Sequence, residues 1–458
     1  MKKDLFPLAR ICLAPAVVFL LVCCRTNKPA ASFSTSFYDQ LSLPDSVGFH
    51  KARYDARGKI LPWVSWDKAL SMEMDWYDRC PVGQRGYPLY FYCTFLDGNY
   101  RSLKPEIIPC TQLGMGILSY LKYYSYLGKS DRRWLEKAQH MGRFLAEESL
   151  TADTGLYPLF PRSSGDNTHL PIRESSQVDL DFGINIIEPD KGGIAGYAWM
   201  LLYDYDGDPK WLQLALHTAG ILVRNMRPGD AWRAPWPFRV DAVTGKYWGE
   251  RNADMVFILR LFDKLIERGH HEFDAPRKQL WDWIVNFQLK VPDTRQETLW
   301  VMFFEDKDKY TNRNSWAPME MARYLIEKKD TLDPHWKAMA ERCIQFAVSH
   351  FTLRAPGGAT LMVEQDDDFD PWGGVCSKLG GVAALFYAAG GGTQYREIAL
   401  RNLNWMTYFV DNDGCPSAMY APGRGNRGGW QEDCHTDKIH NFVDALVAVP
   451  ALGLAPKN

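Results

Sequence analysis

The sequence predicts an all-α protein, an (α/α)6 toroid in which six helical hairpins form two concentric layers. Three observations lead to this fold: helical periodicity in five long segments, an aromatic residue soon after the turn of each, and two further helical segments that complete a sixth pair. The composition agrees. Of the 458 residues, 46% are hydrophobic and 24% charged, which excludes a disordered or collagen-like chain.

Five segments carry apolar residues at spacings of three and four, with a short polar or glycine-containing turn in the middle. They are 111–148, 191–226, 253–289, 315–351 and 378–411. The aromatic residues that follow their turns are Trp134, Trp211, Phe273, Trp336 and Tyr395. A repeated helix pair can bury its apolar face only against its neighbours, so the repeat predicts a continuous array of hairpins.

Two single helical segments flank this array. Residues 64–79 and 437–449 would pack together as the sixth hairpin and close the ring. The glycine pairs Gly192-Gly193 and Gly380-Gly381 open inner helices, where close helix packing explains them better than phosphate binding. The expected toroidal catalytic domain spans 46–458.

The N-terminus has the pattern of an export signal. Basic residues precede an apolar run over 11–22, which is too short to span a bilayer. The run ends in Leu21-Val22-Cys23-Cys24, which resembles a bacterial lipobox. We therefore expect a lipoprotein signal peptide over 1–24, lipidation of Cys24 and a flexible tether over 25–45. The alternative is an ordinary signal peptide that is cleaved elsewhere.

Charge and cysteine content narrow the partners and the compartment. The 53 Lys and Arg residues balance 55 Asp and Glu residues, so the basic excess of a nucleic-acid binder is missing.

We expect an exported lipoprotein of the outer membrane, on its periplasmic or cell-surface side. In that oxidising compartment Cys415 could pair with Cys434, and two of Cys80, Cys93 and Cys110 could pair with each other. Cys343, in an apolar helical stretch, is expected to be a buried free thiol.

The connections between hairpins are long and would all lie on one face of a closed ring. They are 93–110, 174–192, 227–252, 303–314, 362–377 and 412–436. Long connections usually carry function, and these concentrate carboxylates for acid/base chemistry, arginines for sugar carboxylates and indoles for sugar rings. The predicted stacking residues are Trp232, Trp236, Trp248, Trp372 and Trp430. The predicted polar substrate contacts are Arg239, Tyr247, Arg427 and His435.

The stretch 251–260, Arg-Asn-Ala-Asp-Met-Val-Phe-Ile-Leu-Arg, places Asp254 at the start of an inner helix. It resembles a helix start of the six-hairpin glycosidase superfamily, which includes the unsaturated glucuronyl and rhamnogalacturonyl hydrolases. The resemblance covers roughly 60–450 and implies that Asp254 is the general acid/base. Glu364, Asp367 and Glu250 are the candidate carboxylate partners. A capping role at the helix N-terminus is the alternative for Asp254.

These features favour an exported glycoside hydrolase that acts on an oligo- or polysaccharide, expected to be acidic. A polysaccharide lyase or uronyl epimerase on the same fold is the second possibility, with Tyr247 or His435 as base and Arg239 or Arg427 on the sugar carboxylate. An isomerase of single sugars is a version of this second possibility. A non-catalytic glycan-binding lipoprotein is the third. We expect no cofactor, although the acidic run 364–370 could be a calcium site as well as a solvated loop.

Overall fold

The computed structural model describes residues 43–83, 85–104, 107–163, 185–303, 311–354, 356–367, 370–418, 427–431 and 434–454. The chain divides into two units, 1–34 and 35–458, and all described residues belong to the second. Cys24 and most of the expected tether therefore lie outside the described residues. Among the helices that are described, none combines the length and apolar character needed to cross a membrane.

The described residues contain twelve α-helices, and every predicted helical segment is confirmed. The five internal hairpins are α2 (Pro109–Tyr126) with α3 (Arg133–Glu148), α4 (Pro189–Asp206) with α5 (Pro209–Arg224), α6 (Val256–Glu267) with α7 (Asp274–Trp283), α8 (Trp316–Lys328) with α9 (Trp336–Phe351), and α10 (Gly373–Ala388) with α11 (Thr393–Met406). The sixth pair joins the two ends of the unit, α1 (Trp66–Asp78) and α13 (Ile439–Val447).

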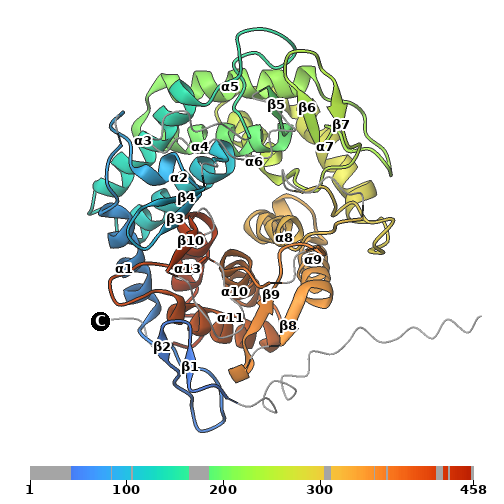
Figure 1. Ribbon diagram of the computed structural model, residues 1–458. Helices are drawn as coiled ribbons and strands as arrows, with labels where there is room; N and C mark the ends of the chain where they lie inside the picture. The colour runs from blue at the N-terminus through green and yellow to red at the C-terminus, as the bar shows by residue number, and fades with distance from the viewer. Residues whose placement is uncertain are drawn as a thin grey trace, which may run out of the picture. The chain divides into compact units, whose positions relative to one another are not determined.

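The first helix of each internal hairpin, together with α13, forms a closed inner ring. Helices α2, α4, α6, α8, α10 and α13 each contact the next, and α13 contacts α2 (Figure 1). The second helix of each hairpin packs outside its own partner. The aromatic residues of the repeat are all buried at the starts of the outer helices, where they fill the space between the layers. The fold is the (α/α)6 toroid that the sequence predicts.

Glycine brings neighbouring inner helices unusually close. A Cβ added at Gly193 of α4 would lie 2.8 Å from the backbone nitrogen of Ile258 in α6. One added at Gly381 of α10 would lie 2.6 Å from Asn441 Oδ1 in α13. Only the absence of a side chain permits this approach. The predicted packing role of these glycines is confirmed, and the starts of α4 and α6 lie side by side.

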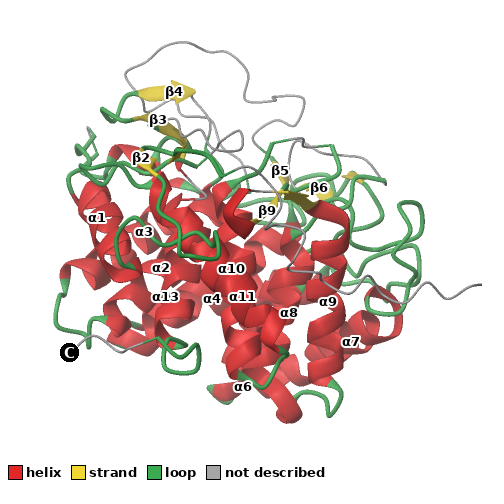
Figure 2. Ribbon diagram, turned by 90° about the horizontal axis from the view of Figure 1, so that it is seen from below, coloured by secondary structure: helices red, strands yellow, loops and turns green. Residues whose placement is uncertain are grey.

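Short strands in the long connections were not predicted. They form three-stranded sheets in the orders β5-β6-β7 and β10-β3-β4 and the pairs β1-β2 and β8-β9. Their bounds are β1 Ser46–Val47, β2 His50–Lys51, β3 Phe95–Asp97, β4 Ser102–Lys104, β5 Ile186–Ile187, β6 Arg239–Asp241, β7 Tyr247–Trp248, β8 Thr352–Arg354, β9 Thr360–Met362 and β10 Gly428–Trp430. Figure 2 shows β3, β4, β5, β6 and β9 together at one end of the helical layer, as expected for connections that share a face.

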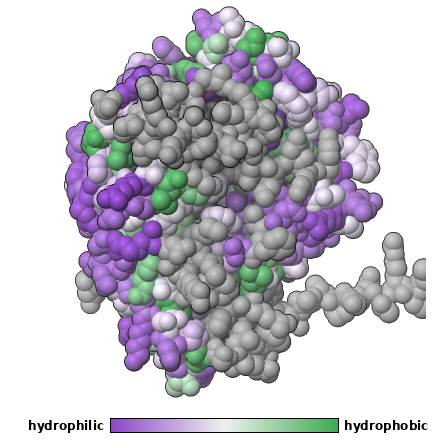
Figure 3. All heavy atoms as spheres, in the orientation of Figure 1, coloured by the Kyte–Doolittle hydropathy of each residue, from purple (hydrophilic) through white to green (hydrophobic). Residues whose placement is uncertain are grey.

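The described surface is mainly hydrophilic on the face seen in Figure 3, and its hydrophobic residues form small separate patches.

The predictions about the cysteines are partly corrected by the structure. Cys343 is a buried free thiol, as predicted. Cys80 and Cys415 are also buried free thiols, so the Cys415–Cys434 disulfide is not formed. The Cys93 thiol forms a hydrogen bond with the Ser102 hydroxyl at 3.0 Å.

Candidate active site

A cluster of six buried polar side chains lies where α4 and α6 begin. We call it the acid cluster, and each member is only 1% exposed. Three members belong to the start of α4 and the residue before it, two lie four and two residues before α6, and one lies on β6; they are Glu188, Asp190, Lys191, Asn252, Asp254 and Arg239. Buried charges are costly unless they are paired, and this cluster consists of three carboxylates, two cations and one amide.

Glu188 pairs with Arg239. The guanidinium Nε of Arg239 donates to Glu188 Oε1 at 3.0 Å. The short sheet produces this contact, because Ile187 of β5 pairs with Val240 of β6 and so brings the two neighbouring residues together. Glu188 directly precedes Pro189, the first residue of α4.

Asp254 shares a lysine with Asp190. Lys191 Nζ lies 3.0 Å from Asp190 Oδ2 and 3.4 Å from Asp254 Oδ2. Asn252 completes the arrangement, since its Nδ2 donates to Asp190 Oδ1 at 2.8 Å and its Oδ1 accepts the backbone N–H of Asp254 at 3.1 Å. The lysine and the amide thus tie the start of α4 to the start of α6.

Burial moves two of these carboxyl groups to neutral pKa values. It raises the pKa of Glu188 to about 7, against the opposing effect of Arg239. It also raises the pKa of Asp254 to about 7, where Lys191 opposes the shift and the negative charges of Asp190 and Glu320 add to it. A carboxyl group that titrates near neutrality can both donate and accept a proton under working conditions.

The contacts of Asp254 do not support a capping role. Helix α6 begins at Val256 with Met255 as its N-cap residue, and no side chain caps it. Among the described residues, Asp254 Oδ1 and Glu188 Oε2 have no hydrogen-bond partner although both are buried. Each carboxyl group therefore keeps one oxygen that none of the described residues binds by a hydrogen bond.

Two of the other predicted carboxylates, Glu250 and Asp367, pair with side chains of the loops. Glu250 lies 2.6 Å from Arg227 Nη1 and accepts a hydrogen bond from the Tyr247 hydroxyl at 3.0 Å. Asp367 pairs with Arg295 at 3.3 Å. Glu364 accepts the backbone N–H of Ser315 through its carbonyl oxygen at 2.8 Å. None of these contacts involves Asp254.

The acidic run 364–370 is partly described, without residues 368 and 369. Its Asp366 forms a two-pronged ion pair with Arg313, through contacts of 2.9 and 3.1 Å. Within the described part of the chain, no group of three or more His, Cys, Asp or Glu side chains is arranged to hold a metal ion. Asp366 and Asp367 of this run thus both pair with arginine side chains.

Two of the five predicted stacking tryptophans lie together. Trp372, the N-cap residue of α10, meets Trp430 of β10 edge to face, with ring centroids 5.6 Å apart. Trp430 also packs against Phe95 of β3 at 4.9 Å. Trp232 is 59% exposed beneath the guanidinium of Arg251, and Trp248 lies beside Lys246.

Two further predictions need comment. Trp236 is fully buried, and its indole N–H donates to the carbonyl oxygen of Leu222 at 2.9 Å. Its predicted role in sugar stacking is wrong, because neither face of the ring is accessible. Arg427 binds the carboxylates of Asp411 and Asp413. Its guanidinium is thus already held by two acidic side chains.

His435 is enclosed in an aromatic box. It lies in a π-helical turn, Cys434–Lys438, directly before α13. The rings of Tyr77, Tyr90 and Tyr120 surround it at centroid distances of 5.6, 5.3 and 6.3 Å. Burial lowers the pKa of His435 to about 3, so the ring is neutral. Neither of its nitrogens has a hydrogen-bond partner among the described residues.

A second ionic network, which the sequence did not reveal, crosses the inner ring. Lys378 of α10 pairs with Glu320 of α8 at 3.0 Å and with Asp437 at 2.8 Å. Arg323 joins Glu320 to Asp444 of α13. These groups come from helices that are distant in sequence. Glu188 was missed too, although it lies directly before α4 much as Asp254 lies two residues before α6, and the same helix-start argument could have found it.

Comparisons with known proteins agree on the fold. No family model matches the chain, and no curated protein is recognisably similar to it in sequence. Among solved structures, a D-mannose isomerase superposes with a TM-score of 0.61 at 12% identity, over 83% of this chain and 97% of the other. The cellobiose 2-epimerase from Spirochaeta thermophila DSM 6192 gives 0.60 at 15% identity, over 85% and 96%.

Two hydrolases share the fold at a similarly low sequence identity. A family 76 glycoside hydrolase from a bovine Bacteroides thetaiotaomicron strain gives a TM-score of 0.56 at 11% identity, over 84% of this chain and 78% of the other. An unsaturated glucuronyl hydrolase specific for heparin gives 0.52 at 10% identity, over 86% and 98%. The chain shares the fold of these enzymes, an (α/α)6 toroid.

Proposed function

We propose that this protein is a carbohydrate-active enzyme, a glycoside hydrolase whose acid/base pair is Asp254 and Glu188. The observation that carries the proposal is the presence of two buried carboxyl groups at neighbouring inner-helix starts. Both have a pKa raised to about 7, and each keeps one oxygen without a hydrogen bond among the described residues. Perturbed carboxyl groups of this kind concentrate at catalytic sites.

Glycoside hydrolysis needs one carboxylic acid to protonate the leaving oxygen and one carboxylate to activate water or attack the sugar. In our proposal Asp254 is the principal acid, because Asp190 and Glu320 add negative charge around it and keep its proton bound. Glu188, whose ionised form Arg239 stabilises, is the better candidate for the carboxylate role.

We expect the sugar to be anionic because the long connections are rich in arginine, and guanidinium binds carboxylates well. The acid cluster itself is balanced when Asp254 is protonated and Glu188 ionised, since Lys191 and Arg239 then face Asp190 and Glu188. Sugar rings would stack on the Trp372–Trp430 pair, which lies in the connections on the same face of the toroid.

An epimerase or lyase is the second candidate, and His435 is the observation that favours it. A neutral histidine with two unbonded nitrogens inside three tyrosine rings has the protonation state of a base. Its pKa of about 3 makes it a weak base, however, because a catalytic base works best with a pKa near the working pH. The carboxyl groups meet that requirement, so we favour hydrolysis. A purely binding protein would need neither arrangement.

Product analysis on uronic-acid-containing oligosaccharides tests the proposal. A hydrolase releases new reducing ends, an epimerase changes the sugar without cleavage, and a lyase leaves an unsaturated sugar. We expect new reducing ends from the native protein and at least a ~100-fold slower release from Asp254→Asn. Epimerised or unsaturated products, lost on substitution of His435, would support the second candidate instead.

We also propose that the protein is exported and anchored in the outer membrane through lipidated Cys24. The basic, apolar and cysteine-containing N-terminal sequence supports this. Mass spectrometry of the mature N-terminus provides the test. A diacylated or triacylated Cys24 is expected, and an unacylated N-terminus well away from Cys23 and Cys24 would refute the proposal.

A further inference from the structure

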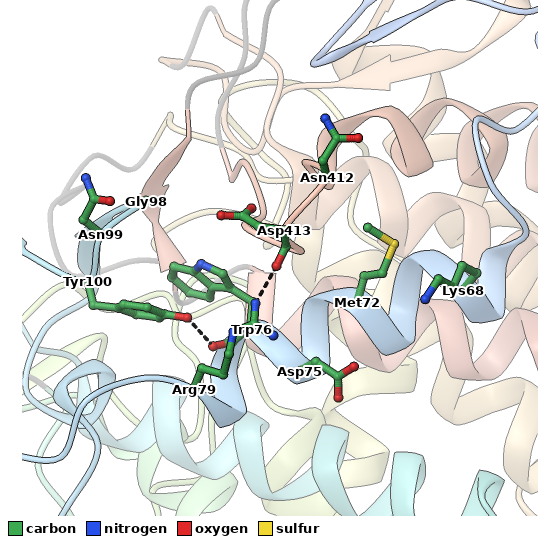
Figure 4. Close-up of a pocket in the computed structure, with 10 residues that line it drawn as sticks. All are labelled: Lys68, Met72, Asp75, Trp76, Arg79, Gly98, Asn99, Tyr100, Asn412 and Asp413. Atoms are coloured by element: carbon green, nitrogen blue, oxygen red, sulfur yellow. Dashed lines mark hydrogen bonds between the residues drawn. The ribbon is translucent and has the colours of Figure 1, made fainter.

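A cavity of about 760 Å³ lies outside the inner ring, between α1 and two turns (Figure 4). One turn, 98–100, links β3 to β4, and the other includes Asn412 and Asp413. No residue of the acid cluster lines it. Its size is within the range of small-molecule sites. The chemistry of its walls indicates what it would bind.

The apolar wall is an aromatic pair held in a fixed position. The Tyr100 ring stacks on the indole of Trp76, with centroids 4.4 Å apart and planes inclined by 24°. The Tyr100 hydroxyl donates to the carbonyl oxygen of Trp76 at 2.7 Å. Tyr100 has a φ of 61°, a left-handed conformation that costs a residue other than glycine about 1–2 kcal/mol. The fold thus fixes the ring against Trp76 despite this cost.

The polar wall consists of side chains that the protein leaves available. Lys68 and Asp75 are exposed on α1, and Asn99 and Asn412 are exposed on the two turns. Within the described residues, none of these four side chains forms a hydrogen bond or ion pair with the protein. Arg79 donates to the carbonyl oxygen of Asp413 and so holds α1 to the second turn.

We propose that this cavity is a peripheral binding site for neutral sugar units of a glycan chain. Amide side chains both donate to and accept from hydroxyl groups. The half-buried ring of Tyr100, which the buried Trp76 holds in place, offers apolar surface to a sugar ring. The charged residues balance, since Lys68, Arg79 and Arg427 oppose Asp75, Asp411 and Asp413. This balance gives a polyanion no advantage over a neutral sugar.

The sheet connects this cavity to the predicted stacking residues. Strand β3 runs from Phe95, which pairs with Trp430, to the turn at Gly98. Three residues of strand span about 10 Å. A single glycan could therefore contact both places. In this respect the inference rests on the proposed function, because the bound chain would be an extension of the substrate.

Calorimetry with mannohexaose, cellohexaose and hexagalacturonate tests the site in the Asp254→Asn protein, which is proposed not to turn substrate over. Tyr100→Gly removes the ring and suits the positive φ, so the fold should persist. We expect it to weaken binding of at least one neutral hexasaccharide about 3- to 10-fold. Asn412→Ala should act in the same direction. Tyr126→Ala, which removes an exposed ring at the far end of α2, should leave affinity unchanged.

Unchanged affinity in both Tyr100→Gly and Asn412→Ala overturns the proposal, as does absence of any neutral hexasaccharide binding. If only hexagalacturonate bound, and its binding weakened with salt, the proposal that the ligand is a neutral sugar would be overturned. These results are independent of turnover. If Asp254→Asn kept full activity while Tyr100→Gly lost binding, the proposed acid/base role would fail and the peripheral site would stand.

Discussion

Gln288 donates its side-chain Nε2–H to the carbonyl oxygen of Ala253 at 2.8 Å, one peptide before Asp254. The N–H of the same peptide unit donates to Asn252 Oδ1. Gln288 is 1% exposed and ends a π-helical turn, Ile284–Gln288, that extends α7. Such turns often occur at functional sites. Two side-chain amides therefore hold the backbone that carries the proposed acid.

Replacing Gln288 with Leu should lower kcat about 10- to 100-fold with little change in KM, because small displacements of a catalytic group are costly. Gln279→Leu is the matched control. Gln279 lies on the same helix and also donates to a backbone carbonyl, that of Arg227, but on the exposed side. Steady-state kinetics on both variants provides the check. Equal kinetics in the two would show that Gln288 does not position Asp254.

The pH dependence of stability should report the buried proton of Asp254. Because its folded-state pKa of about 7 exceeds the ordinary value, the folded protein retains a proton that the unfolded chain releases. Its contribution to the free energy of unfolding is fully present below pH ~4 and is lost as pH rises through 7. Asp254→Asn removes this loss. Between pH 5 and 7, the free energy of unfolding of the variant should therefore rise relative to that of the wild type by at most ~1.4 kcal/mol per pH unit.

Urea unfolding at several pH values measures this difference. The opposing contribution of His435 is the same in both proteins and cancels. Asp153→Asn, which neutralises an exposed carboxylate, corrects for the general effect of removing one negative charge. If the difference in free energy of unfolding between Asp254→Asn and the wild type stayed constant across the pH range, the raised pKa of Asp254 would be contradicted.

Gly193→Ala should separate α4 from α6. The new Cβ would lie 2.8 Å from Ile258 N, and overpacking of this kind costs about 1–3 kcal/mol. Gly220→Ala is the control, because that glycine lies within α5 and faces open space. It should be neutral or stabilise by up to ~1 kcal/mol. Thermal unfolding of both variants checks this, and equal melting temperatures would contradict the close approach.

The tryptophans should separate into two kinds. Trp372→Ala and Trp430→Ala should each weaken oligosaccharide binding by roughly 1 kcal/mol, the value of a typical aromatic contact. Trp236→Phe should instead lower the melting temperature and leave affinity unchanged, because its ring is buried and its N–H is bonded to Leu222. Calorimetry and thermal unfolding on all three variants distinguish them. Unchanged affinity in both Trp372→Ala and Trp430→Ala would place the cleft elsewhere.

The helical architecture could be predicted because its signal is local and repeated. Each hairpin shows its own periodicity, and residues such as Trp134 and Trp336 mark the same place in successive repeats. The short strands could not be predicted in this way. Strand β5 has two residues, and its partner β6 follows only after a complete hairpin. Pairing at such a distance leaves no periodic pattern in the sequence.

The candidate site could be predicted only in part, for the same reason. Asp254 precedes an apolar helical run, which is a local pattern. The partners of the acid cluster come from separate segments: Lys191 belongs to the start of α4, and Arg239 belongs to a strand some 50 residues later. Trp236 illustrates the opposite error. Its place in a long connection suggested exposure, but whether a loop residue is buried depends on the helices beneath it.

The central claim is that Asp254 and Glu188 perform acid/base chemistry, and turnover measured beside stability tests it most directly. Asp254→Asn and Glu188→Gln keep the shape of each side chain but remove the titrating proton. We expect each variant to lose at least ~100-fold in turnover while its melting temperature at pH 7 stays equal to or above that of the wild type. Near-normal turnover in either variant, with or without a change in melting temperature, would remove that residue from the mechanism.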